Sequence, residues 1–247
     1  MSQSSDIPQT AASPRVLPPW LAPVVAFAVS AGALAILAAL FPADTRVVAV
    51  YLLSALTASL LVCTTCPFGG CWGWRLVRAA APAAGGFAVL VILAPAAALP
   101  AFLVLLPFAA GLGGLVELLT ALRVPRRVAG GAVAILAVLL MTTLFWGTQL
   151  WRLLGRGAGD AVLHACVHAN PMLALCDDAA AGFYWPTGGA KMMMYSQITR
   201  LGQDIPFVQP AWWATSLVYL VAAAVTWPLS WWIRRRGKSR ASAAAAR

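Results

Sequence analysis

The longest apolar run of the chain extends over 44 residues, from Ala79 to Leu122, and its one charged side chain is Glu117. A helix that crosses a bilayer needs about 20 apolar residues, so this run is long enough for two crossings. Proline interrupts the hydrogen-bond ladder of a helix, and the interval from Pro95 to Pro100 lies near the middle of the run. The run therefore predicts a membrane-embedded helical hairpin that is broken at these prolines.

The composition of the whole chain points to the same class. Hydrophobic residues make up 62% of the 247 residues and charged residues 10%, whereas soluble domains carry about 25% charged residues. Together with the hairpin, the other apolar segments give about six spans, and the sequence predicts an all-α polytopic membrane protein. These segments are Trp20–Phe41, Arg46–Val62, Val128–Trp151 and Trp212–Ile233.

Lysine and arginine are divided unevenly between the two predicted sides. Of the 17, 12 lie in the N-terminal tail (1–19, predicted to be disordered), the loops 63–78 and 123–127, and the basic tail 234–247. The positive-inside rule therefore predicts a bacterial-type cytoplasmic membrane protein with both termini in the cytoplasm. The net charge of +10 is gathered at helix ends, which favours membrane lipid as a partner and not nucleic acid.

The interval 156–210 is the one long stretch that is not a simple apolar span, and the charge rule places it outside the cytoplasm. It separates a five-helix region (20–155) from the last helix (211–233). Ala158–His168 has helical character, and Asn170 followed by Pro171 is typical of a helix N-cap with proline in the first turn. Two short helices broken at this point predict a re-entrant or interfacial helical hairpin between spans five and six.

Asp160, His164 and His168 recur every four residues, so on a helix they share one face. Imidazole and carboxylate groups suit a transition metal ion such as zinc, copper or iron. The alternative is that they are polar residues on a half-buried interfacial helix, since a metal site usually has more ligands.

The five cysteines form two groups. Cys166 and Cys176 flank the Asn-Pro turn on the predicted oxidising side, so they are either a disulfide or two small buried residues. Cys63, Cys66 and Cys71 contain a Cys-x-x-Cys spacing that suits metal binding or thiol exchange. An iron–sulfur cluster needs four thiolates, so simple packing is the preferred interpretation of this group.

Glu117 is an ionisable residue inside a predicted span, which makes it a candidate for a substrate path. The alternative is an ion pair with Arg123 or Arg126 near the interface. The sequence contains no Walker A loop, Gly-x-Ser-x-Gly or His-Glu-x-x-His motif. No catalytic activity is therefore predicted for the chain itself, and any use of ATP requires a partner.

The predicted topology resembles that of the permease subunits of ABC-2-type (type V) exporters. The residues that carry the resemblance are Ala169-Asn170-Pro171, Met172-Leu-Ala-Leu175, Pro210-Ala-Trp-Trp213 and the Arg234–Arg236 stop. It implies a substrate path whose outer mouth lies near Asn170 and Pro171, no cofactor, and a homo- or hetero-oligomer with a cytoplasmic ATPase. Where that family has a coupling helix, this chain has Cys63–Arg78, which contains no acidic residue.

Two other functions stay open. One is a membrane redox or metal-binding subunit that uses the Asp160, His164 and His168 face or the first cysteine group. The other is a structural anchor subunit of a larger membrane complex. The second half of the long interval, 182–210, gives no pattern that favours either.

Overall fold

The computed structural model describes residues 18, 20–65, 72–155, 157–175 and 211–245, and every regular element in these ranges is helical. The predicted all-helical class is therefore confirmed. Residues 171–175 add further helical turns directly after Asn170. The labelled helices are α1 (Leu21–Leu40), α2 (Ala43–Thr65), α3 (Trp72–Leu93), α4 (Pro95–Ala121), α5 (Arg126–Met141), α6 (Thr143–Leu154), α7 (Ala158–Ala169) and α10 (Trp212–Ala245).

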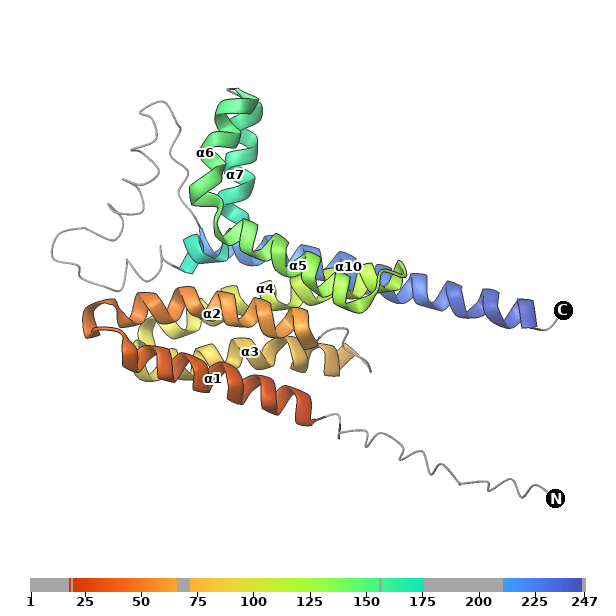
Figure 1. The fold of residues 1–247 in the computed structure, drawn as a ribbon, viewed down its shortest axis with the longest axis horizontal. Coiled ribbons are helices and arrows are strands. Elements are labelled where there is room, and N and C mark those ends of the chain that lie inside the picture. The colour runs from red at the N-terminus through yellow and green to blue at the C-terminus, as the bar shows by residue number, and fades with distance from the viewer. Residues whose placement is uncertain (1–17, 19, 66–71, 156, 176–210, 246–247) are drawn as a thin grey trace, which may run out of the picture.

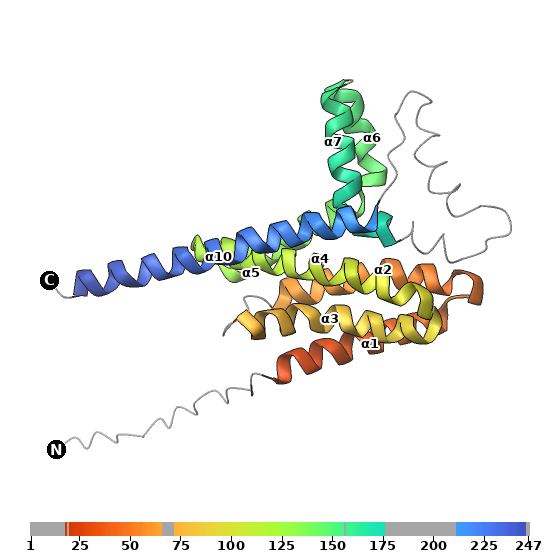
Figure 2. The same ribbon diagram turned by 180° about the vertical axis from the view of Figure 1, so that it is seen from behind.

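Helices α1 to α5 and α10 run roughly along one axis and alternate in direction along the chain (Figures 1 and 2). The start of α1 and the end of α10 lie toward the same end of this bundle. The same end holds the starts of α3 and α5 and the end of α4, and we call it the basic end because Arg75, Arg126, Arg127 and Arg234 belong to it. The pair α6 and α7 stands across the bundle at the opposite end (Figure 1).

Among the residues that the structure describes, four helices are long and apolar enough to cross a membrane, so the prediction of about six spans is wrong. They are Leu21–Leu40, Gly73–Leu93, Ala98–Ala121 and Trp212–Gly237. Helix α5 has 16 residues and is about 24 Å long, which is less than the hydrocarbon thickness of about 30 Å. The apolar part of α2, Ala49–Thr65, is also short. The four candidate spans indicate a multi-pass membrane protein.

The predicted fifth span, Val128–Trp151, is broken between Met141 and Thr143. In an unbroken helix the Leu139 carbonyl would accept the N–H of Thr143. It accepts the indole N–H of Trp146 at 2.9 Å, while the Thr142 hydroxyl donates to Val138 at 2.8 Å. Side-chain donors of this kind compete with the helix ladder and let a helix bend, so an apolar run that looks continuous forms two helices.

The predicted break between the third and fourth spans is confirmed, because α3 ends at Leu93 and α4 begins with Pro95. Two further prolines, Pro100 and Pro107, lie inside α4, and Pro107 has no N–H to give to the Leu103 carbonyl. The Ser216 hydroxyl of α10 lies 2.9 Å from this carbonyl oxygen and 2.8 Å from that of Trp212. Its single O–H is therefore a bifurcated donor that the two carbonyl oxygens share. A donor from α10 thus satisfies a backbone group that proline leaves open in α4, as an apolar environment requires.

Replacing Ser216 with alanine is expected to lower the free energy of unfolding by about 1–2 kcal/mol, because the Leu103 carbonyl loses its donor. Denaturant unfolding of the purified chain in detergent measures the loss. In a Pro107→Ala background the backbone N–H at 107 bonds the carbonyl, so the same substitution should cost less. An equal loss in both backgrounds would show that the Ser216–Leu103 contact is not its cause.

Helix α4 packs more extensively against α10 than any other pair of helices in the described part of the chain. The contact is close because Gly114 has no side chain: a Cβ there would lie 2.1 Å from the Thr226 hydroxyl oxygen and 2.7 Å from Cδ1 of Trp227. Small residues let helix backbones approach in this way when no hydrophobic effect drives the helices together.

Gly114→Ala is expected to destabilise the chain by about 1–3 kcal/mol, because overpacking forces α4 and α10 apart. Gly32→Ala on α1 is the matched control, since no atom beyond its chain neighbours and the backbone of its own helix lies within 4 Å of the position that its added methyl group would take. That control should be neutral or slightly stabilising, because alanine is the better helix former. Equal stability of the two variants in thermal unfolding would contradict the packing argument.

Candidate functional site

The carboxylate of Glu117 is fully buried near the end of α4, at the basic end of the bundle. Its Oε2 atom lies 3.0 Å from Nη1 of Arg75, in the first turn of α3, and 3.6 Å from Nη2 of Arg234 on α10. Arg234 also donates to the Glu117 carbonyl and to the Thr120 hydroxyl, each at 3.3 Å. We call Arg75, Glu117 and Arg234 the Glu117 cluster, and it joins three helices.

The two arginines of the Glu117 cluster differ in their exposure. The Arg75 side chain is 8% exposed, whereas that of Arg234 is 34% exposed. A buried charge is costly unless a partner lies close to it, so Arg75 and Glu117 depend on each other. The contact with Arg234 is partly screened by its surroundings and contributes less.

Sequence reasoning selected Glu117 but not these partners. Arg75 and Arg234 are distant from it in the chain, and only the order of helices in the bundle brings them together. Arg126, one of the two partners considered, donates to the carbonyls of Thr64 and Thr65 at the end of α2. Whether Glu117 also lies beside a substrate path stays a prediction.

Asn170 is completely buried at the point where α7 ends. Its Oδ1 atom accepts hydrogen bonds from the backbone N–H groups of Met172 (2.9 Å) and Leu173 (3.2 Å), which is the predicted helix cap. Its Nδ2 atom donates to the carbonyl of Met141, the last residue of α5, at 3.2 Å. One side chain therefore caps the turns after Pro171 and also bonds a carbonyl exposed by the α5–α6 break.

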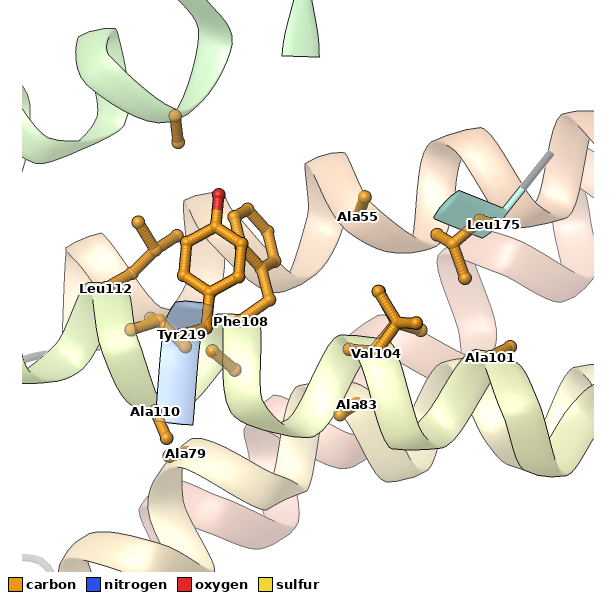
Figure 3. Close-up of a cluster of buried hydrophobic side chains, with 14 of the residues drawn as sticks. Ala55, Ala79, Ala83, Ala101, Val104, Phe108, Ala110, Leu112, Leu175 and Tyr219 are labelled. Atoms are coloured by element: carbon orange, nitrogen blue, oxygen red, sulfur yellow. The ribbon is translucent and has the colours of Figure 1, made fainter. Parts of the chain in front are cut away.

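Helix α10 holds the same junction from the other side. The Tyr219 hydroxyl donates to the Ala169 carbonyl at 2.5 Å. The Tyr219 ring packs edge-on against Phe108 of α4, with ring centroids 4.9 Å apart (Figure 3). Sequence reasoning missed Tyr219, although a buried tyrosine hydroxyl in an apolar helix needs a partner. We call Tyr219, Ala169, Asn170 and Met141 the Asn170 junction.

Near this junction the structure describes a helical hairpin that pairs α7 with α6. Helix α7 packs against α6, which is the second half of the predicted fifth span, through a cluster of Trp151, Leu163, Val167 and Leu173. A Cβ on Gly159 would lie 2.8 Å from Cδ1 of Trp151, so glycine permits this close approach. The sequence also predicts a second short helix after Pro171, from Met172 to Ala181, which is described only as far as Leu175, so its pairing with α7 stays a prediction. The partner within the described residues is α6 because the α5–α6 break supplies an additional short helix.

The predicted metal ligands lie on α7, and the structure gives one of them a different partner. The Asp160 carboxylate accepts the indole N–H of Trp151 at 2.6 Å, which fastens α7 to α6. The rings of His164 and His168 have centroids 6.3 Å apart. Within the described ranges, no group of three or more His, Cys, Asp or Glu side chains is placed to hold a metal ion. Metal binding here stays a prediction that rests on the spacing alone.

The cysteine hypotheses fall largely on residues outside the described ranges. Cys176, Cys66 and Cys71 all lie there, so both the disulfide and the Cys-x-x-Cys site stay predictions. Cys63 is buried in α2. Cys166 is half-buried on α7, and this burial raises the pKa of its thiol above the ordinary value, which makes it a weaker nucleophile at neutral pH.

Helix α10 thus contributes to two separate groups of polar contacts, one at each end of the bundle. The Glu117 cluster lies at the basic end, and the Asn170 junction lies at the opposite end, beneath the α6–α7 hairpin (Figure 2). Asn170 belongs to that junction and Pro171 directly follows it in the chain, while Glu117 belongs to the cluster. Comparisons of the chain with protein-family models, with curated proteins and with solved structures found no match.

Proposed function

We propose that the chain is the membrane-spanning permease subunit of an ABC-type exporter, which forms part of a substrate path and relies on a separate ATPase. The observation that carries this proposal is the α6–α7 hairpin, which is inserted between α5 and α10 at the end opposite to the basic end (Figure 1). The sequence resembles ABC-2-type permeases through two short helices broken at Asn170-Pro171 before the last span, and α7 is the first of these two helices. The basic end then faces the cytoplasm, where an ATPase docks.

Helix α10 is the element through which such an ATPase acts on the outer mouth. Its Arg234 belongs to the Glu117 cluster at the basic end, and its Tyr219 holds the carbonyl of Ala169 at the Asn170 junction. A displacement of the basic end therefore reaches the hairpin along one continuous helix that is packed tightly on α4. Coupling between distant sites requires a connected physical element of this kind.

In this proposal Asn170 and Pro171 position the mouth of the path and do not contact the substrate. The Asn170 side chain is buried, and its amide is bonded at both its oxygen and its nitrogen. Glu117 likewise holds α3, α4 and α10 together at the inner end.

The test is purification of the tagged, full-length chain from its native membranes, followed by measurement of ATP hydrolysis. The proposal expects a stoichiometric ATPase subunit in the purified complex and hydrolysis that vanadate inhibits. A chain that purifies alone, or with proteins that do not hydrolyse ATP, contradicts it. Stoichiometric transition metal in such a chain would favour the redox or metal-binding subunit.

A further inference from the structure

A cavity of about 460 Å³ lies between the end of α2 and the start of α5, at the basic end of the bundle. Arg126 and Arg127 form its polar side, and Leu60, Gly131 and Ala134 form part of its apolar side. No acidic side chain is among its described lining residues. The cavity therefore combines two positive charges with an apolar floor.

The position of the two arginines conflicts with the electrostatics of α5. They are the first two residues of the helix, where the helix dipole is positive and favours anions over cations. The first turn contains no acidic residue, and Pro125 at the N-cap offers no side-chain hydrogen bond to the N–H groups of this turn. A bound anion would resolve both problems, because it accepts from these N–H groups and pairs with the guanidinium groups.

Contacts with α2 hold one of the arginines beside the cavity. The Arg126 Nη2 atom donates to the carbonyl oxygens of Thr64 at 3.2 Å and Thr65 at 3.1 Å. These acceptors belong to the last turn of α2, where carbonyl groups have no partner within the helix. The site is thus built from both helices.

The surroundings of the cavity indicate a lipid as the source of the anion. Leu60 is 46% exposed, and the neighbouring α5 residues Val128 and Ile135 are 57% and 64% exposed, so the outer surface here is apolar. A charged rim at a helix end with an apolar groove below it matches a phospholipid, which has a charged headgroup and long acyl chains. We propose that this groove binds one anionic phospholipid, whose phosphate pairs with Arg127 and the first turn of α5 and whose acyl chain lies along Gly131 and Ala134.

The inference does not depend on the permease proposal. It needs only a membrane around the helices, and the lipid would bind whether or not an ATPase docks at the basic end. Either proposal can therefore fail while the other stands.

The test compares binding of phosphatidylglycerol and phosphatidylcholine to the purified full chain by native mass spectrometry. The wild-type chain should retain phosphatidylglycerol in preference to phosphatidylcholine. Arg127→Gln should weaken phosphatidylglycerol binding roughly fivefold, the effect of one basic residue near an anionic surface. Gly131→Leu should abolish the preference, because its side chain enters the groove from a position with no protein atom within 4 Å.

Two variants serve as matched controls. Arg123→Gln removes one charge from the same end of the bundle outside the groove, and Gly32→Leu makes the same steric change on α1. Both should bind phosphatidylglycerol like the wild-type chain, and size-exclusion profiles should show that all four variants are folded. Inorganic phosphate at millimolar concentration should not displace the lipid.

Three results would overturn the proposal. The first is equal retention of the two lipids by the wild-type chain. The second is unchanged phosphatidylglycerol binding by folded Gly131→Leu and Arg127→Gln. The third is displacement of the lipid by inorganic phosphate alone, which would assign the site to a free anion.

Discussion

Glu117→Gln is expected to destabilise the chain by about 3–5 kcal/mol, because it leaves the buried guanidinium of Arg75 without its counter-charge. The Arg75 side chain is only 8% exposed and lies 3.0 Å from the carboxylate, so water cannot replace the lost partner. The measurement is denaturant unfolding of the purified chain in detergent, with accumulation in membranes as a second readout.

Two further variants separate the ion pair from general packing. Replacing both Arg75 and Glu117 with methionine removes both charges and should recover most of the lost stability, as apolar replacements of buried ion pairs do. Arg234→Met should cost less than Glu117→Gln, because Arg234 is partly exposed and more distant from the carboxylate. A Glu117→Gln chain as stable as the wild type, or a double variant no better than the single one, would refute the role of the cluster.

Asn170→Ala is expected to cost about 2–4 kcal/mol, the sum of two separate losses. Removing an N-cap side chain costs about 1 kcal/mol, and leaving the buried Met141 carbonyl without its donor costs about 1–3 kcal/mol. Hydrogen exchange should rise in the turns after Pro171 and on both sides of the α5–α6 break. Unfolding of the same protein gives the total loss.

Asn170→Ser divides the two losses. Its hydroxyl oxygen can still cap the turns after Pro171, but it is too short to reproduce the bond of the Asn170 amide to Met141. We expect a loss of about 1–3 kcal/mol, the part that belongs to the Met141 carbonyl, with increased exchange confined to the α5–α6 break. Unchanged exchange at α6 and α7 in Asn170→Ala would mean that Asn170 does not hold the hairpin.

Features that depend on neighbours in the chain were predictable from the sequence. The α3–α4 break follows from Pro95, and the cap at Asn170 follows from an acceptor side chain placed before a proline. The boundaries of α1 also match its predicted span to within one residue at each end. In these cases the determining residues lie within one helical turn of the feature.

Features that depend on distant parts of the fold were not predictable. At the α5–α6 break, the Met141 carbonyl is bonded by Asn170, which lies 29 residues away in the chain, and nothing in the local apolar pattern indicates this partner. The partners of Glu117 were not predictable either, because several arginines lie at the basic end. The packing of α3 and α10 on α4 places Arg75 and Arg234 beside the carboxylate. The open carbonyl at Leu103 was predictable from Pro107, but the donor Ser216 was not.

The predicted topology is tested most directly by measuring on which side of the membrane the α6–α7 hairpin and the end of α10 lie. Single cysteines at Ala165 and Gly237, both exposed positions, are introduced into a chain whose five native cysteines are replaced by alanine. Right-side-out vesicles are then treated with a membrane-impermeant maleimide. Labelling is expected at position 165 in intact vesicles and at position 237 only after permeabilisation. Labelling of both positions from the same side, or of position 237 alone, would contradict the predicted topology.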